Sequence, residues 1–189
     1  MVEGGSRAKR VAFLVMIGAL GNALGGLSIY LANIGPIGVD LSHLATFIAA
    51  VYGGPVIGFY AGALVGLFPG IYFGFIGGSL GFLALLGLPL GKALTGLTAG
   101  WLVKAFKISN PSRRSTLIVP SLLIGYIPES IFTTLFFLGL VPIFLGWSSI
   151  PMLITILTKA WIEIAILSFI MLAFIRNKSF SRYMESAVS

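Results

Sequence analysis

Four charged residues lie inside long apolar stretches of this 189-residue sequence: Lys92, Glu129, Lys159 and Glu163. Ionisable groups in hydrocarbon are costly, so they usually face a cavity, a partner charge or a transport pathway. Two cations and two anions could neutralise one another across neighbouring helices, as a buried ion-pair network that only holds the protein together. The same groups could instead line a polar chamber that binds a small hydrophilic solute. The residue types leave both interpretations open.

Helical spacing places further polar residues beside these charges. Thr155 and Lys159 precede Glu163 at four-residue intervals, which puts all three on one face of a helix. Tyr126 lies one turn before Glu129 and could supply a flat wall of a binding site. The candidate chamber therefore draws on the last three apolar stretches of the chain.

Asp40 and His43 stand one turn apart at the start of a shorter apolar stretch. The Asp40 carboxylate can accept the unpaired backbone N–H groups at the start of a helix. His43 is the only histidine, and a metal site needs three or four ligands, so we expect no metal and place His43 at the chamber mouth as a ligand contact. The sequence has no zinc-protease, serine-hydrolase or nucleotide-loop motif, so we expect neither catalysis nor a cofactor.

Lipid is the solvent that suits this composition. Hydrophobic residues make up 58% of the chain and charged residues 9%, whereas a soluble domain usually carries about 25% charged residues. The chain has no cysteine, which excludes disulfides, thiolate metal sites and cysteine catalysis. We therefore predict an all-α integral membrane protein.

Breaks rich in glycine and proline divide the sequence into six apolar stretches, which we predict as the transmembrane helices of a single domain, residues 1–189. The predicted spans are residues 11–32, 40–53, 56–72, 78–104, 117–140 and 152–175. A full crossing takes about 20 residues, so the second span is short.

Basic residues gather in three tracts beside the ends of these spans: residues 7–10, 104–114 and 176–182. With six spans, all three tracts and both termini lie on one side, which the positive-inside rule places in the cytoplasm. A five-span arrangement would split the tracts across the membrane. Membrane topology thus explains the net charge of +7 without any nucleic acid. We expect a multi-pass protein of the cell membrane, surrounded by lipid.

The first span carries small residues at helical spacing. Gly18, Asn22 and Gly26 share one face, and Ala19 and Ala23 lie beside them. Small residues allow helix backbones to approach closely in lipid. They could serve packing within this bundle or the docking of another membrane subunit.

The region of the second and third spans resembles a transporter family. A loop of proline and glycine and a short apolar helix are followed by Gly54-Pro55-Val-Ile-Gly58-Phe-Tyr-Ala-Gly62. This order is similar to that of S components, the substrate-binding subunits of energy-coupling factor (ECF) vitamin transporters. Ala19 and Ala23 also resemble the family's Ala-x-x-x-Ala signature in the first span.

The resemblance implies a six-helix subunit that captures a vitamin-like small molecule on the outer side. It would dock to a transmembrane T subunit, which works with a pair of cytoplasmic ATPases, and Ala19 and Ala23 would form the docking surface. The family's pocket would draw here on Lys92, Glu129, Lys159, Glu163, Tyr126, Asp40 and His43. Nickel and cobalt members begin with a Met-His arrangement, whereas this chain begins Met-Val-Glu, which argues against those metals.

The main alternative is a self-sufficient, ion-coupled secondary transporter of a small polar solute. Such a carrier would use the intramembrane carboxylates as proton sites. Carriers of this kind often contain inverted repeats, and the sequence shows no convincing internal repeat. A membrane-embedded enzyme or an assembly scaffold is a further alternative.

Overall fold

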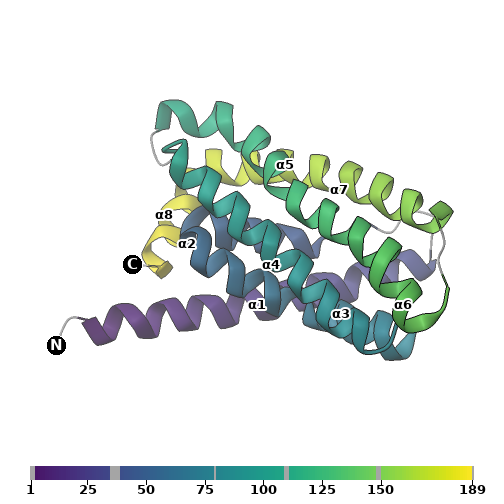
Figure 1. Ribbon diagram of the computed structural model, residues 1–189. Helices are drawn as coiled ribbons and strands as arrows, with labels where there is room; N and C mark the ends of the chain where they lie inside the picture. The colour runs from purple at the N-terminus through teal and green to yellow at the C-terminus, as the bar shows by residue number, and fades with distance from the viewer. Residues whose placement is uncertain (1–2, 35–38, 79, 109–110, 148–149, 189) are drawn as a thin grey trace.

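Apolar stretches in lipid must satisfy their backbone hydrogen bonds internally, which helices do. The computed structural model describes residues 3–34, 39–78, 80–108, 111–147 and 150–188, and within these ranges it contains helices but no strand (Figure 1). In chain order the elements are α1 (Glu3–Ile34), α2 (Ser42–Val65), α3 (Leu67–Ile71), the π-helix η1 (Tyr72–Ile76), α4 (Phe82–Ala105), α5 (Pro111–Leu135), the π-helix η2 (Phe136–Leu140), α6 (Val141–Leu145), α7 (Ile150–Arg176) and α8 (Lys178–Val188). The predicted all-α fold class is confirmed.

Five helical runs in the described part of the chain are long and apolar enough to cross a membrane. They are Arg7–Leu31, Ser42–Ile76, Phe82–Ala105, Thr116–Leu145 and Ile150–Arg176. The chain is therefore a multi-pass membrane protein. The predicted second and third spans, residues 40–53 and 56–72, fall within the single run Ser42–Ile76, so the arrangement of six crossings stays a prediction.

The run Ser42–Ile76 is not straight, because the chain folds back at Gly54. Gly54 has φ 79° and ψ −172°, a backbone region that is open almost only to glycine. A Cβ atom on Gly58 would lie 3.1 Å from the Cα atom of Ala50, whereas eight residues of straight helix span about 12 Å. Residues 42–53 and 55–65 therefore lie side by side. Pro55 suits the first position after the break, because it has no N–H to satisfy there.

Glycines fasten the second half of α2 to α4. A Cβ atom on Gly58 would lie 2.4 Å from the carbonyl oxygen of Gly96, and one on Gly62 would lie 2.2 Å from that of Lys92. The two helix backbones are thus in direct contact, as small residues permit in membrane proteins. This contact fixes the backbone position of Lys92, which lies at the centre of the candidate site.

Asn22 fastens α1 to the same region. Its amide nitrogen donates to the carbonyl oxygens of Gly18 and Leu64, each at 2.8 Å, and its amide oxygen accepts the backbone N–H of Phe68 at 2.8 Å. Gly18 also lies against the Leu64 side chain. The face of the first span that carries Gly18 and Asn22 therefore serves packing inside the bundle.

The last helix, α8, lies across the end of the bundle where α1 begins and where α4 ends (Figure 1). The hydroxyls of Ser181 on α8 and Tyr52 on α2 form a hydrogen bond of 2.9 Å. Phe180 and Met184 pack on the main apolar core. A smaller cluster around Phe136, Phe137, Val141 and Leu153 forms elsewhere in the bundle, from η2, α6 and α7.

Candidate functional site

The ammonium group of Lys92 is the centre of the candidate site. Its side chain is only 3% exposed, and its Nζ donates to Asp40 Oδ2 and to Ser42 Oγ, each at 2.8 Å. The third contact is to His43 Nδ1 at 3.0 Å. An ammonium has three N–H donors. All three are therefore satisfied by residues at the start of α2.

His43 connects this cation to a buried carboxylate. Because Lys92 donates to Nδ1, we assign the imidazole hydrogen to Nε2. Nε2 lies 3.2 Å from both carboxylate oxygens of Glu129. The hydroxyl of Thr95, one turn beyond Lys92 on α4, donates to Glu129 Oε2. The site thus contains a continuous hydrogen-bonded path from Asp40 through Lys92 and His43 to Glu129.

Glu163, on α7, reaches the same site and binds the backbone of the segment before α2. Its Oε1 accepts the backbone N–H of Asp40 at 2.9 Å and lies 3.6 Å from Lys159 Nζ. The Lys159 side chain is 54% exposed, against 10% for Glu163. Nearby, Ser28 on α1 accepts the backbone N–H of Leu41 at 2.9 Å. Three helices therefore hold the segment that leads into α2.

Aromatic rings cover one side of the path. Tyr126 on α5 stands edge-on to His43, with ring centroids 6.0 Å apart, and edge-on to Trp161 at 5.1 Å. The indole N–H of Trp161 donates to Ser130 Oγ at 3.3 Å. This arrangement joins a flat apolar surface to the polar groups, as binding sites for small molecules require.

Asp40 lies in the segment that connects α1 to α2, one residue before the N-cap Leu41. Its Oδ1 accepts the backbone N–H of Ser42 at 2.9 Å and also the Ser42 hydroxyl. Burial alone would raise the pKa of Asp40, but the Lys92 ammonium holds the pKa of this carboxyl well below its usual value. Asp40 is therefore ionised at neutral pH.

The structure brings the predicted site residues together, with different pairs from those expected. Asp40, His43, Lys92, Glu129 and Glu163 form one connected group. Tyr126 packs on this group, and Lys159 stands at its edge.

The expected balance of two lysines against two glutamates is thus only partly found, because Lys159 lies beside Glu163 whereas Lys92 has another partner. In the part of the chain that the structure describes, Lys92 is paired with Asp40 and not directly with a glutamate, while Glu129 accepts hydrogen bonds from His43 and Thr95. The sequence interpretation missed Ser42 and Ser28. The Asp-x-Ser order at the start of a helix is the one signal that could have identified Ser42, because such short side chains bond to nearby backbone.

The predicted docking residues lie apart from this site. Ala19 and Ala23 are exposed on α1. Among the described residues, no group of three or more histidine, aspartate or glutamate side chains is placed to hold a metal ion.

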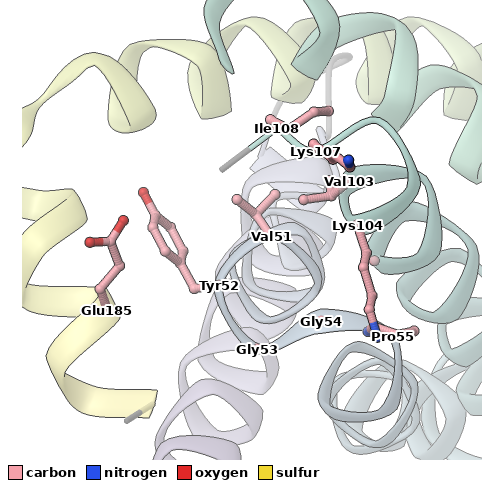
Figure 2. A pocket seen from close by; sticks show the side chains of 11 residues that line it. Val51, Tyr52, Gly53, Gly54, Pro55, Val103, Lys104, Lys107, Ile108 and Glu185 are labelled. Carbon is pink, nitrogen blue, oxygen red and sulfur yellow. The ribbon is translucent and has the colours of Figure 1, made fainter. Parts of the chain in front are cut away.

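A separate open cavity of about 500 Å³ lies near the reversal of α2. Figure 2 shows Tyr52 and Glu185 on one side of it and Lys104 and Lys107 on the other. The lysines belong to one of the basic tracts, so this cavity marks the basic end of the bundle. It lies about ten residues of helix, roughly 15 Å, from the start of α2 at the candidate site.

Comparisons with protein-family models, with curated proteins and with solved structures found no match for this chain.

Proposed function

We propose that this chain is the substrate-binding subunit, or S component, of an ECF-type importer in the cell membrane, and that it captures a small water-soluble vitamin or related micronutrient. The observation that carries the proposal is the polar group around Lys92, in which five ionisable or imidazole side chains meet between apolar helices. Buried polar groups in a membrane protein usually mark a substrate or ion pathway.

Two features outside the site support the same proposal. The sequence has no nucleotide-binding loop, so active uptake would draw its energy from an ion gradient or from another subunit, and uptake driven by ATP would need a separate ATPase. Ala19 and Ala23 are exposed and available to a T subunit. The Gly54–Gly62 motif contributes less, because Gly58 and Gly62 are fully used in packing α2 against α4.

Mass spectrometry under native conditions tests the binding role directly. The gently purified protein should carry one vitamin-sized organic molecule per chain, which denaturation releases for identification. Substituting Lys92 by Met should remove that molecule, because its ammonium holds the centre of the site. A protein that carries nothing and binds none of a vitamin panel would contradict the proposal.

A pair of tryptophans tests the docking surface. Ala19→Trp with Ala23→Trp should abolish association with the T subunit and the ATPases, and with it uptake, while the isolated chain still binds its solute. The matched control is Ile131→Trp with Leu135→Trp, which has the same spacing on the exposed surface of α5. Equal loss of association in both double variants, or loss of solute binding in the first, would place the docking surface elsewhere.

A secondary transporter coupled to protons is the second candidate, favoured by the imidazole of His43 between an ammonium and a carboxylate. Proteoliposomes that contain only this chain distinguish the two functions. Uptake driven by a pH gradient would establish the carrier. Uptake that requires ATP and the partner subunits would establish the S component.

A further inference from the structure

The contacts of Lys92 have a property that the proposed function does not use. All three partners of its ammonium come from residues 40–43, at the start of α2. In the described part of the chain, neither Glu129 nor Glu163 bonds to this ammonium. The buried cation therefore depends on one short segment for its charge compensation, and that segment has a single carboxylate.

The donors around the Asp40 carboxylate form a complete cradle. Oδ2 accepts from Lys92 Nζ at 2.8 Å, and Oδ1 accepts the Ser42 backbone N–H at 2.9 Å together with the Ser42 hydroxyl. Among the described residues, the hydrogen bonds to this carboxylate come from Lys92 and Ser42, and His43 Nδ1 lies farther away, at 3.6 Å from Oδ2. An ammonium and a backbone N–H hold any carboxylate in the same way, whether or not it is attached to the chain.

Exposure shows from which side a carboxylate could arrive. The Asp40 side chain is 32% exposed, whereas that of Lys92 is 3% exposed and Ser42 is fully buried. An incoming carboxylate therefore meets Asp40 first and reaches Lys92 only by taking its place.

The number of charges at the site also favours a solute carboxylate that replaces Asp40 over one that binds in addition to it. Three carboxylates, of Asp40, Glu129 and Glu163, already stand against two ammonium groups, of Lys92 and Lys159, and the His43 imidazole lies between Lys92 and Glu129. A fourth anion at this distance would be repelled strongly in a medium of low dielectric constant. Replacement of Asp40 leaves the number of charges at the site unchanged, because its side chain, already 32% exposed, can turn toward water.

We propose that Lys92 and Ser42 form a carboxylate-binding subsite, which Asp40 fills as a tethered competitor until the carboxylate of a solute displaces it. The inference rests on the proposed function and narrows the solute to molecules that carry a carboxylate. A tethered group competes at a high effective concentration, so Asp40 sets how tightly the solute must bind.

Rescue by small carboxylates tests this subsite without knowledge of the solute. Asp40→Ala empties the cradle, whereas Asp40→Asn keeps it filled with a neutral group of the same size. We expect sodium formate or acetate to raise the Tm of the purified Asp40→Ala protein saturably, by about 3–6 °C at ten times the Kd. The Tm of the wild type and of Asp40→Asn should not change.

Three controls make the result specific. Sodium chloride at equal ionic strength and the neutral analogues formamide and acetamide should give no rise in Tm. Lys92→Met added to Asp40→Ala should abolish the rescue. Asp40→Ser serves in place of Asp40→Ala if the latter does not fold, because it also removes the carboxylate.

The inference is overturned if formate and acetate fail to raise the Tm of both Asp40→Ala and Asp40→Ser. It is also overturned if chloride raises the Tm equally, or if the rise persists after Lys92→Met is added. A bound natural solute without a carboxylate would also overturn it, yet would leave the proposed function standing. Conversely, rescue by formate in a protein that binds no solute and no ATPase partner would support the subsite and contradict the proposed function.

Discussion

At the scale of single residues, the site shows how a membrane protein keeps charges among apolar helices. Lys92 donates all three of its N–H groups, and Glu129 accepts from both Thr95 and His43. Breaking a buried pair by removing one partner costs about 3–5 kcal/mol, because the other charge is left uncompensated. Each charged member of the group therefore stabilises the protein by compensating the charge of its neighbour.

Thr95 offers the cleanest test of this dependence. Thr95→Val keeps the shape of the side chain but removes the hydroxyl that donates to the Glu129 carboxylate. We expect the protein to lose about 1–3 kcal/mol of unfolding free energy, because a buried carboxylate loses a donor. Denaturant unfolding in detergent micelles measures the change.

The matched control lies one turn further along α4. The Thr98 hydroxyl donates only to the Leu94 carbonyl of its own helix, at 2.8 Å. Such a bond adds little to helix stability, so Thr98→Val should change the unfolding free energy by less than about 0.5 kcal/mol. Equal effects of the two substitutions would show that the Thr95–Glu129 contact contributes nothing of its own.

Acid should weaken the contribution of Asp40. A carboxyl whose pKa is lowered in the folded state stabilises the protein above the pKa of the unfolded chain, and this stabilisation is lost as the pH falls through the folded pKa. The Tm difference between wild type and Asp40→Asn should therefore be constant from pH 7 to about pH 5 and should shrink below about pH 4. A difference that grows on acidification would contradict the pairing with Lys92.

At the scale of elements, α2 decides where the site forms. Residues 42–53 make a helix of only about 18 Å, which ends at the reversal and begins beside Lys92. The rest of the run packs backbone against backbone on α4. The short first half thus carries Ser42 and His43 into the interior of the bundle, while the second half holds α4 in register with them.

Two glycine-to-alanine substitutions, one in α2 and one in η2, distinguish the effect of a steric clash from the effect of reduced backbone freedom. In Gly58→Ala the new Cβ would lie 2.4 Å from a backbone oxygen of Gly96, which cannot move aside without shifting α4. We expect a loss of about 1–3 kcal/mol in unfolding free energy. Gly139→Ala is the control, because a Cβ there meets nothing within 4 Å. A loss from Gly139→Ala as large as that from Gly58→Ala would contradict the packing argument.

The sequence predicts the residues of this site better than their pairing. Charges inside apolar stretches identify Lys92, Glu129 and Glu163, because lipid penalises a charge that has no function or partner. The pairing of Lys92 with Asp40 depends instead on how deep in the bundle the start of α2 lies. That position follows from the reversal of the chain at Gly54, and the adjoining glycines and Pro55 indicate only that a break exists there.

At the scale of the whole molecule, the two ends of the bundle differ in charge. Lys104, Lys107 and Glu185 of α8 line the cavity near the reversal of α2. The start of α1 lies toward this same end, whereas η1 and α6 lie toward the other (Figure 1). The basic end should therefore face the cytoplasm.

Single cysteines test this orientation, because the chain has none of its own. Ser186→Cys lies on the exposed side of α8, and Ile76→Cys lies at the end of η1, where Ile76 is 68% exposed. In intact cells a membrane-impermeant maleimide should label Ile76→Cys but not Ser186→Cys. After permeabilisation both should react, while the unsubstituted protein stays unlabelled. Labelling of Ser186→Cys in intact cells would invert the bundle, and the Asp40 side of the site would then open toward the cytoplasm, which is incompatible with capture of a solute from outside.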